Sequence, residues 1–134
     1  MTDEQIDGLV EAFLAGRVDP AAFDHASHVA VAWAILGRSA RDAAALQVAD
    51  GLRRITLRAG KPERYHETIT QAFVRIIAAR RRPGEPWGAF AARNPDLFQS
   101  GLLERYYDRD VLTSDEARLG WLEPRRPFTH FEEP

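Results

Sequence analysis

The chain has 134 residues, of which 45% are hydrophobic and 28% are charged, the composition of one ordinary globular domain. Eighteen lysines and arginines against twenty aspartates and glutamates leave a net charge of -2, so nucleic acid or a membrane surface is not expected as the main partner. The absence of cysteine excludes disulfides, thiolate metal sites and cysteine nucleophiles. The N-terminal residues do not resemble a signal peptide and no apolar run reaches the roughly 20 residues of a membrane span, so we expect a cytoplasmic protein.

Four long helices are predicted in the first two thirds of the chain. The first covers residues 3–15, where apolar residues recur at helical spacing after an N-cap residue. The second covers residues 24–36 and is apolar on nearly all sides, which predicts a central position in the core. The third covers residues 39–60, although Gly51 in its middle costs about 1 kcal/mol relative to alanine. The fourth covers residues 62–82, with proline in its first turn and arginines in its last.

Shorter helices are predicted in the last third, over residues 87–93, 101–107 and 114–121. No stretch alternates β-branched and aromatic residues between hairpin turns, so strands are not expected. The predicted fold is all-α: a single helical domain over residues 1–123, built as a bundle of four main helices with short C-terminal helices. An extended tail is predicted over residues 124–134.

Three of the four histidines lie in two short clusters that also contain carboxylates. Asp24, His25 and His28 stand at the start of the second helix, where positions three apart share a face. His66 and Glu67 stand near the start of the fourth helix, at helical spacing from apolar residues that follow. We therefore expect the imidazoles of His28 and His66 to point inward and to meet in one pocket.

Neutral imidazoles and carboxylates are good ligands for divalent transition metals. The predicted metal ligands are His25, His28, His66 and Glu67, with Asp24 as a further member. A small polar ligand bound by the same groups is the alternative occupant. The zinc-protease pattern HExxH is absent, because no second histidine follows His66 at that spacing.

The same clusters predict acid–base or hydrolytic chemistry in an enzymatic interpretation. His66 is then a ligand or acid–base residue, Glu67 the carboxylate ligand or general base, and Tyr65 an orienting hydroxyl. Trp33 and Thr70 are the predicted contacts to a bound small molecule.

A structural interpretation stays open for these residues. Histidine and glutamate at a helix start can cap the backbone, and Thr70 can bond to it. Tyr65 can pack on Ile69 outside the helix, and Trp33 can be core. The protein is then a non-enzymatic interaction module with a buried histidine network, and its C-terminal third forms the surface of a homodimer or heteromer.

The string HxxHVxxAW, from His25 to Trp33, and the string YHETIT, from Tyr65 to Thr70, are distinctive. With Tyr106 and later residues they resemble a family of small uncharacterised bacterial all-helical proteins, over about residues 1–123. The resemblance implies that these segments matter and implies no particular reaction. It does not cover the tail, so His130 is not expected to take part.

Overall fold

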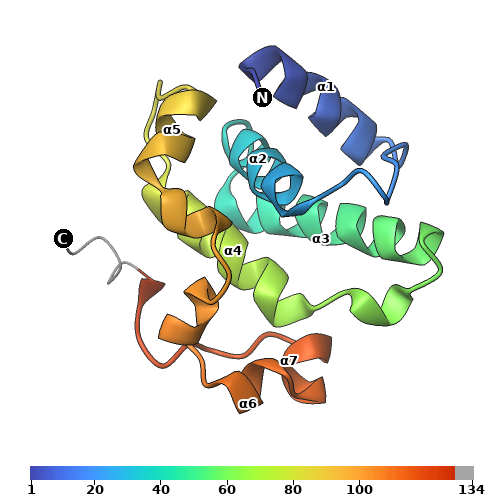
Figure 1. The fold of residues 1–134 in the computed structure, drawn as a ribbon, viewed down its shortest axis with the longest axis vertical. Coiled ribbons are helices and arrows are strands. Elements are labelled where there is room, and N and C mark those ends of the chain that lie inside the picture. The colour runs from blue at the N-terminus through green and yellow to red at the C-terminus, as the bar shows by residue number, and fades with distance from the viewer. Residues whose placement is uncertain (129–134) are drawn as a thin grey trace.

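The computed structural model describes residues 1–128, and no strand occurs in that part of the chain. The predicted all-helical class is confirmed. The helices, labelled in Figure 1, are α1 (Asp3–Leu14), α2 (His25–Leu36), α3 (Arg41–Arg58), α4 (Glu67–Arg80), α5 (Trp87–Arg93), α6 (Arg109–Leu112) and α7 (Asp115–Leu119). Three 3-10 turns lie between them: η1 (Pro62–Arg64), η2 (Pro95–Phe98) and η3 (Leu102–Arg105).

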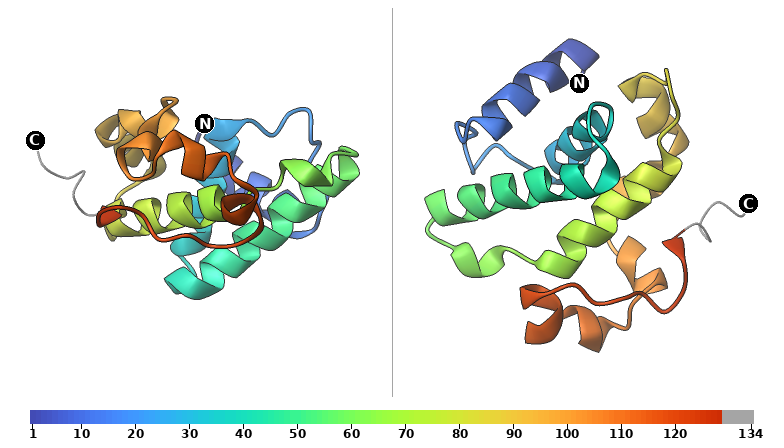
Figure 2. Two further views of the ribbon diagram at one scale, coloured as in Figure 1. Left: turned by 90° about the horizontal axis from the view of Figure 1, so that it is seen from below. Right: turned by 180° about the vertical axis from the view of Figure 1, so that it is seen from behind.

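Helix α2 occupies the centre of the molecule, as its sequence predicts. It packs against α1 on one side and against α3 and α4 on the other (Figure 1). Residues 29–33 of α2 are all buried, because neighbouring helices cover every side of it. The short helices α6 and α7 lie beside the first half of α4, as both views in Figure 2 also show. No helix in the described part of the chain has both the length and the apolarity needed to cross a membrane.

The predicted fourth helix is interrupted near its start. Residues 62–64 form only a 3-10 turn, and the backbone is then extended at Tyr65 and His66, with ψ of 133° and 110°. His66 is the N-cap of α4, and its Nδ1 accepts a hydrogen bond from the backbone N–H of Ile69 at 3.1 Å. The prediction that His66 lies inside this helix is therefore wrong, and a capping interaction is the physical reason.

The C-terminal third differs more from the prediction. The helix expected over 101–107 is only a 3-10 turn, because Gly101 has a φ of +89° and turns the chain sharply before it. Helix α6 and turn η2 were not predicted. Helix α7 begins after Ser114, whose hydroxyl accepts from the N–H of Ala117 at 3.2 Å. Beyond α7, the N–H of Arg125 donates to the carbonyl of Tyr106 at 2.8 Å. Residues 129–134 of the predicted tail, including His130, lie outside the described residues.

Gly51 has a packing role that the sequence does not reveal. A Cβ atom at this position would lie 2.1 Å from Cζ of Phe13, whose ring is buried between α1 and α3. The close approach of these helices therefore requires the hydrogen of a glycine.

Candidate functional site

The first turns of α2 place two histidines on the same side of the helix. Asp24 is the N-cap, and its Oδ1 accepts from the N–H and the hydroxyl of Ser27, both at 2.9 Å. These hydrogen bonds lower the pKa of the Asp24 carboxyl, the bond from the Ser27 N–H most. Because the helix begins at His25, His25 and His28 lie about one turn apart, and their ring centroids are 6.3 Å from each other. The predicted shared face of this pair is present.

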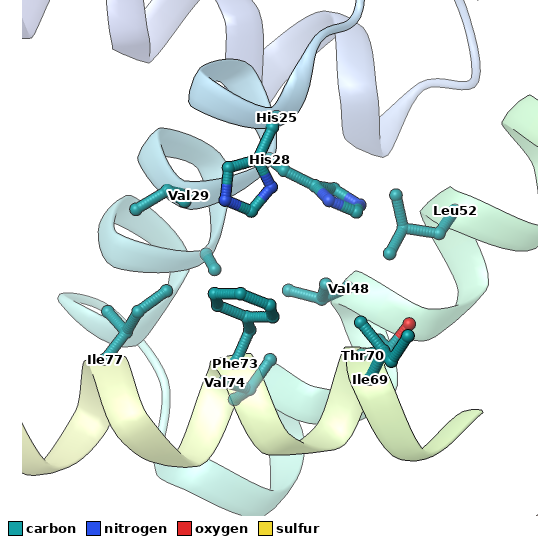
Figure 3. Close-up of a pocket in the computed structure, with 11 residues that line it drawn as sticks. His25, His28, Val29, Val48, Leu52, Ile69, Thr70, Phe73, Val74 and Ile77 are labelled. Carbon is teal, nitrogen blue, oxygen red and sulfur yellow. The ribbon is translucent and has the colours of Figure 1, made fainter. Parts of the chain in front are cut away.

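Both imidazoles line a small cavity between α2, α3 and α4, which we call the inner cavity (Figure 3). The space open to the centre of a water molecule is about 20 Å³. Because one water molecule needs about 10–15 Å³ by the same measure, the cavity is large enough for one water. Apart from the two histidines and Thr70, its walls are apolar. The lining residues are His25, His28, Val29 and Ala32 from α2, Val48 and Leu52 from α3, and Ile69, Thr70, Phe73, Val74 and Ile77 from α4.

His28 is a half-buried polar residue in the wall of this cavity. Its Nε2 is inaccessible to solvent and has no hydrogen-bond partner within residues 1–128. Burial, and to a lesser extent the nearby His25, lower the pKa of the His28 imidazole to about 4. The ring, which lies edge to face against Phe23, is therefore neutral at physiological pH. An unpaired buried nitrogen costs about 1–3 kcal/mol, so this arrangement is expensive for the fold alone.

His25 is held by a contact distant in sequence. Its Nε2–H donates to the carbonyl of Leu97 at 2.8 Å, which leaves Nδ1 as an acceptor in the neutral ring. The ring also lies edge to face against Phe73, with centroids 5.1 Å apart. His25, Ile69 and Phe73 line both the inner cavity and a larger hollow outside it. These three side chains therefore form the boundary between the two spaces.

The larger hollow, the outer groove, has a volume of about 450 Å³. Its walls are His25, Ile69, Phe73, Leu112 and residues 98–104. Most of these side chains are apolar, and Glu104, the only carboxylate among the described lining residues, pairs with Arg109 at 3.0 Å. This volume lies in the range typical of small-molecule sites.

His66 does not reach either space. Besides its capping bond, its Nε2–H donates to the carbonyl of Leu112 at 2.7 Å, so both ring nitrogens are used. His66 is among the lining residues of neither the inner cavity nor the outer groove. The expectation that His28 and His66 share one pocket is therefore wrong. The extended backbone at Tyr65 and His66 turns the ring toward the C-terminal segment instead.

Glu67 and Tyr65 do not line the inner cavity and bond to each other outside it. Oε1 of Glu67 accepts from the hydroxyl of Tyr65 at 2.5 Å and from Arg53 at 3.2 Å, while Oε2 accepts from Gln71 at 3.2 Å. Burial and the Glu67 hydrogen bond raise the pKa of Tyr65. The side chain of Thr70, which lines the cavity, interacts with the same Tyr65 hydroxyl. Of the YHETIT string, Ile69 and Thr70 face the inner cavity directly.

The four predicted metal ligands do not converge. His25 and His28 line the inner cavity, His66 caps α4, and Glu67 pairs with Arg53. Among residues 1–128 no group of three or more histidine and carboxylate side chains is placed to hold a metal ion. A catalytic metal normally has three protein ligands.

Trp33 is a core residue and not a wall of the inner cavity. Its ring packs against Trp87, with centroids 5.5 Å apart, and against Phe90. The guanidinium of Arg81 lies 4.8 Å from the ring centroid, and its Nε donates to the Trp33 carbonyl at 2.9 Å. The predicted ligand contact by Trp33 is therefore not provided by this site.

Sequence reasoning missed the far wall of the outer groove. Residues 98–104 and Leu112 come from two 3-10 turns, the loop between them and the end of a one-turn helix. No spacing signal links them to α2, because the contact of His25 with Leu97 spans 72 positions. Comparisons of the chain with family models, with curated proteins and with solved structures give no match.

Proposed function

We propose that the protein binds a small, largely apolar molecule in the outer groove, with a hydrogen-bonding group of that molecule reaching His28 through the boundary formed by His25 and Phe73. The observation that carries the proposal is the buried Nε2 of His28, a residue that lines the inner cavity, because this atom has no partner among residues 1–128. A ligand hydroxyl or N–H bonded to this nitrogen would remove a desolvation cost of about 1–3 kcal/mol.

The surroundings of His28 support a role in ligand binding more than a role in proton transfer. A general base works best with a pKa near the working pH, and burial holds the pKa of His28 at about 4. The neutral ring is instead a fixed hydrogen-bonding group in apolar surroundings, which gives orientation and specificity to an apolar site. Thr70 offers a hydroxyl on the same cavity wall. Acid–base catalysis by His66, Glu67 and Tyr65 has less support, since these side chains already bond to other groups.

The test is a titration with 1,8-octanediol, an uncharged chain with a hydroxyl at each end. We expect it to shift the NMR signals of the methyl groups of Val29, Thr70 and Ile77, which line the inner cavity. His28→Leu keeps the bulk and removes the nitrogen, so it should weaken binding by about tenfold. His28→Gln is the matched control, because an amide at this position retains hydrogen bonding and should restore most of the affinity. Unchanged methyl signals in the wild-type protein would refute the proposal.

Two alternatives from the sequence have different support. A divalent metal at His25 and His28 would need a further ligand from outside the described residues or from solvent. An interaction module is favoured by Leu57 and Leu119, which are 67% and 71% exposed and line the same surface hollow of about 370 Å³. A homodimer through this surface would cover both side chains, and the mass of the protein in solution tests it.

The helical bundle, the cellular location and the family expected from the sequence are also part of this proposal. We propose that α1 to α4 act as one four-helix bundle that carries the site, and that the protein works in the cytoplasm without nucleic acid or membrane as a partner. Membership of the family of small bacterial helical proteins with the HxxHVxxAW and YHETIT strings is likewise proposed.

A further inference from the structure

We infer that the ligand also carries an oxyanion, a carboxylate or a phosphate, which binds in an arginine-lined hollow next to the outer groove. This inference rests on the proposed function. The hollow, here called the arginine groove, has a volume of about 710 Å³. Its walls are residues 79–82, residues 93–96, Gln99 and Arg105. Gln99 lines both grooves, and Arg105 directly follows the wall of the outer groove, so the two hollows are neighbours.

The charges on these walls are strongly unequal. Five arginines line the arginine groove, and among its described lining residues Asp96 is the only carboxylate. The whole chain has a net charge of -2, so this concentration of positive charge is local. A concave surface that carries one sign of charge concentrates ligands of the opposite sign.

Within residues 1–128, carboxylates pair with Arg80, Arg93 and Arg105 of this groove. Asp96 accepts from Arg80 in bidentate fashion, at 2.6 and 2.9 Å, and also from Arg105 at 3.3 Å. One carboxylate thus serves two guanidiniums, and the hydrogen bond from Arg80 lowers the pKa of Asp96. Arg93 pairs with Glu85 at 2.6 Å. Arg82 is exposed and makes no ion pair with a described residue.

The chemistry of these groups selects an oxyanion. A guanidinium presents parallel N–H groups that match two oxygens of a carboxylate or phosphate, as the Arg80 and Asp96 pair already shows inside the groove. Arg105, whose side chain is 47% exposed, has donors beyond its single contact with Asp96. Arg105 and Arg82 are therefore the groups that we assign to the ligand, while Arg80 and Asp96 hold the wall in place.

The order of the arginine groove, the outer groove and His28 fits an amphipathic ligand. Its anionic end lies at Arg105 and Arg82, its apolar body lies in the outer groove, and its other end points toward His28. Glu104, the carboxylate in the outer groove, does not oppose such a ligand strongly because Arg109 neutralises it at 3.0 Å.

Calorimetric titration with two probes of equal chain length tests this inference. We expect 8-hydroxyoctanoate, which has a carboxylate at one end, to bind about tenfold more tightly than 1,8-octanediol. Arg105→Gln should reduce the affinity for the acid to that for the diol, and Arg82→Gln should reduce it about threefold. Arg17→Gln removes an exposed arginine outside this groove and is the matched control, which should leave both affinities unchanged. The phosphate ester of 1,8-octanediol in the same titration identifies the preferred oxyanion, since the tighter of the two anionic probes carries it.

The outcomes separate the two proposals. Equal affinities for the acid and the diol, both weakened by His28→Leu, would overturn the oxyanion and leave the proposed function standing. Binding of the acid that depends on Arg105 but not on His28 would support the arginine groove and contradict the proposed function. An equal loss in Arg17→Gln and Arg105→Gln would show general attraction to positive charge and would also overturn the inference.

Discussion

Replacing His28 with leucine should change how the stability of the protein depends on pH. The pKa of this imidazole falls from 6.5 in the unfolded chain to about 4 in the folded protein, chiefly through burial. Between these two values the unfolded chain binds a proton that the folded protein excludes, so stability falls as pH falls. The contribution is fully present above pH 6.5 and is lost as the pH approaches 4. At about 1.4 kcal/mol for each tenfold change in proton affinity, the loss is about 3 kcal/mol.

Urea unfolding followed by circular dichroism, repeated between about pH 4 and pH 8, measures this effect. The wild-type free energy of unfolding should fall by about 3 kcal/mol across the range, whereas His28→Leu should lose much less. The control is Val74→Ala, which shortens another buried side chain that lines the inner cavity and removes no titratable group. It should lower stability by a similar amount at every pH. The depressed pKa values of Asp24 and Asp96 lie below 3.8, so loss of stability through these carboxylates belongs to lower pH.

Two results would contradict this prediction. A wild-type loss below about 1 kcal/mol between pH 6.5 and 4 would mean that His28 titrates almost as in water, so it would not be a desolvated group. A full loss retained in His28→Leu would assign the pH dependence to another residue. At neutral pH the leucine variant should be as stable as the wild type or more stable, because it removes an unpaired buried nitrogen.

Two further substitutions test the interpretation of the fold. His66→Ala should lower the free energy of unfolding by about 1–3 kcal/mol at pH 7, measured in urea, because it removes the cap of α4 and the hydrogen bond to Leu112; an unchanged stability would contradict the capping role. Gly51→Ala should destabilise by about 1–3 kcal/mol through overlap with Phe13, whereas Gly8→Ala, in α1 with no atom within 4 Å of the added Cβ, should stabilise by about 0.5–1 kcal/mol. Stabilisation by both alanines would show that helix propensity outweighs this contact.

The periodicity of apolar residues predicts most of the helical core. It places the first three helices within about two residues of their observed ends, because each has a continuous apolar side and a recognisable stop. It fails at Tyr65 and His66, where an apolar pattern continues through a break in the helix. A histidine in the first turn and a histidine at the N-cap have the same sequence neighbours, so spacing does not distinguish them. The 3-10 turns after Asn94 have four residues each, which is too short for a repeating pattern of apolar residues to identify them.

The candidate site is predictable only in part, for a related reason. The spacing of His25 and His28 on one helix is local, and the structure preserves it. The wall of the outer groove depends on where the chain returns after α5, which brings Leu97 to His25. Such long-range contacts leave no mark in the spacing of residues within one segment. The arginine groove could not be predicted for the same reason, since Arg82 and Arg105 line it from segments that are distant in sequence.

The two histidines that the sequence treats as equivalent differ in what the fold gains from them. His66 has both ring nitrogens bonded to backbone groups, and this fully accounts for an imidazole at that position. His28 has an inaccessible Nε2 with no partner among residues 1–128, although an apolar side chain of similar size would continue the apolar helix around it. A group that weakens the fold where it stands, in the wall of a cavity next to a groove, is accounted for by the ligand proposed above. His28, whose Nε2 has no partner among residues 1–128, therefore supports a ligand site, whereas His66, with both ring nitrogens bonded, belongs to the scaffold.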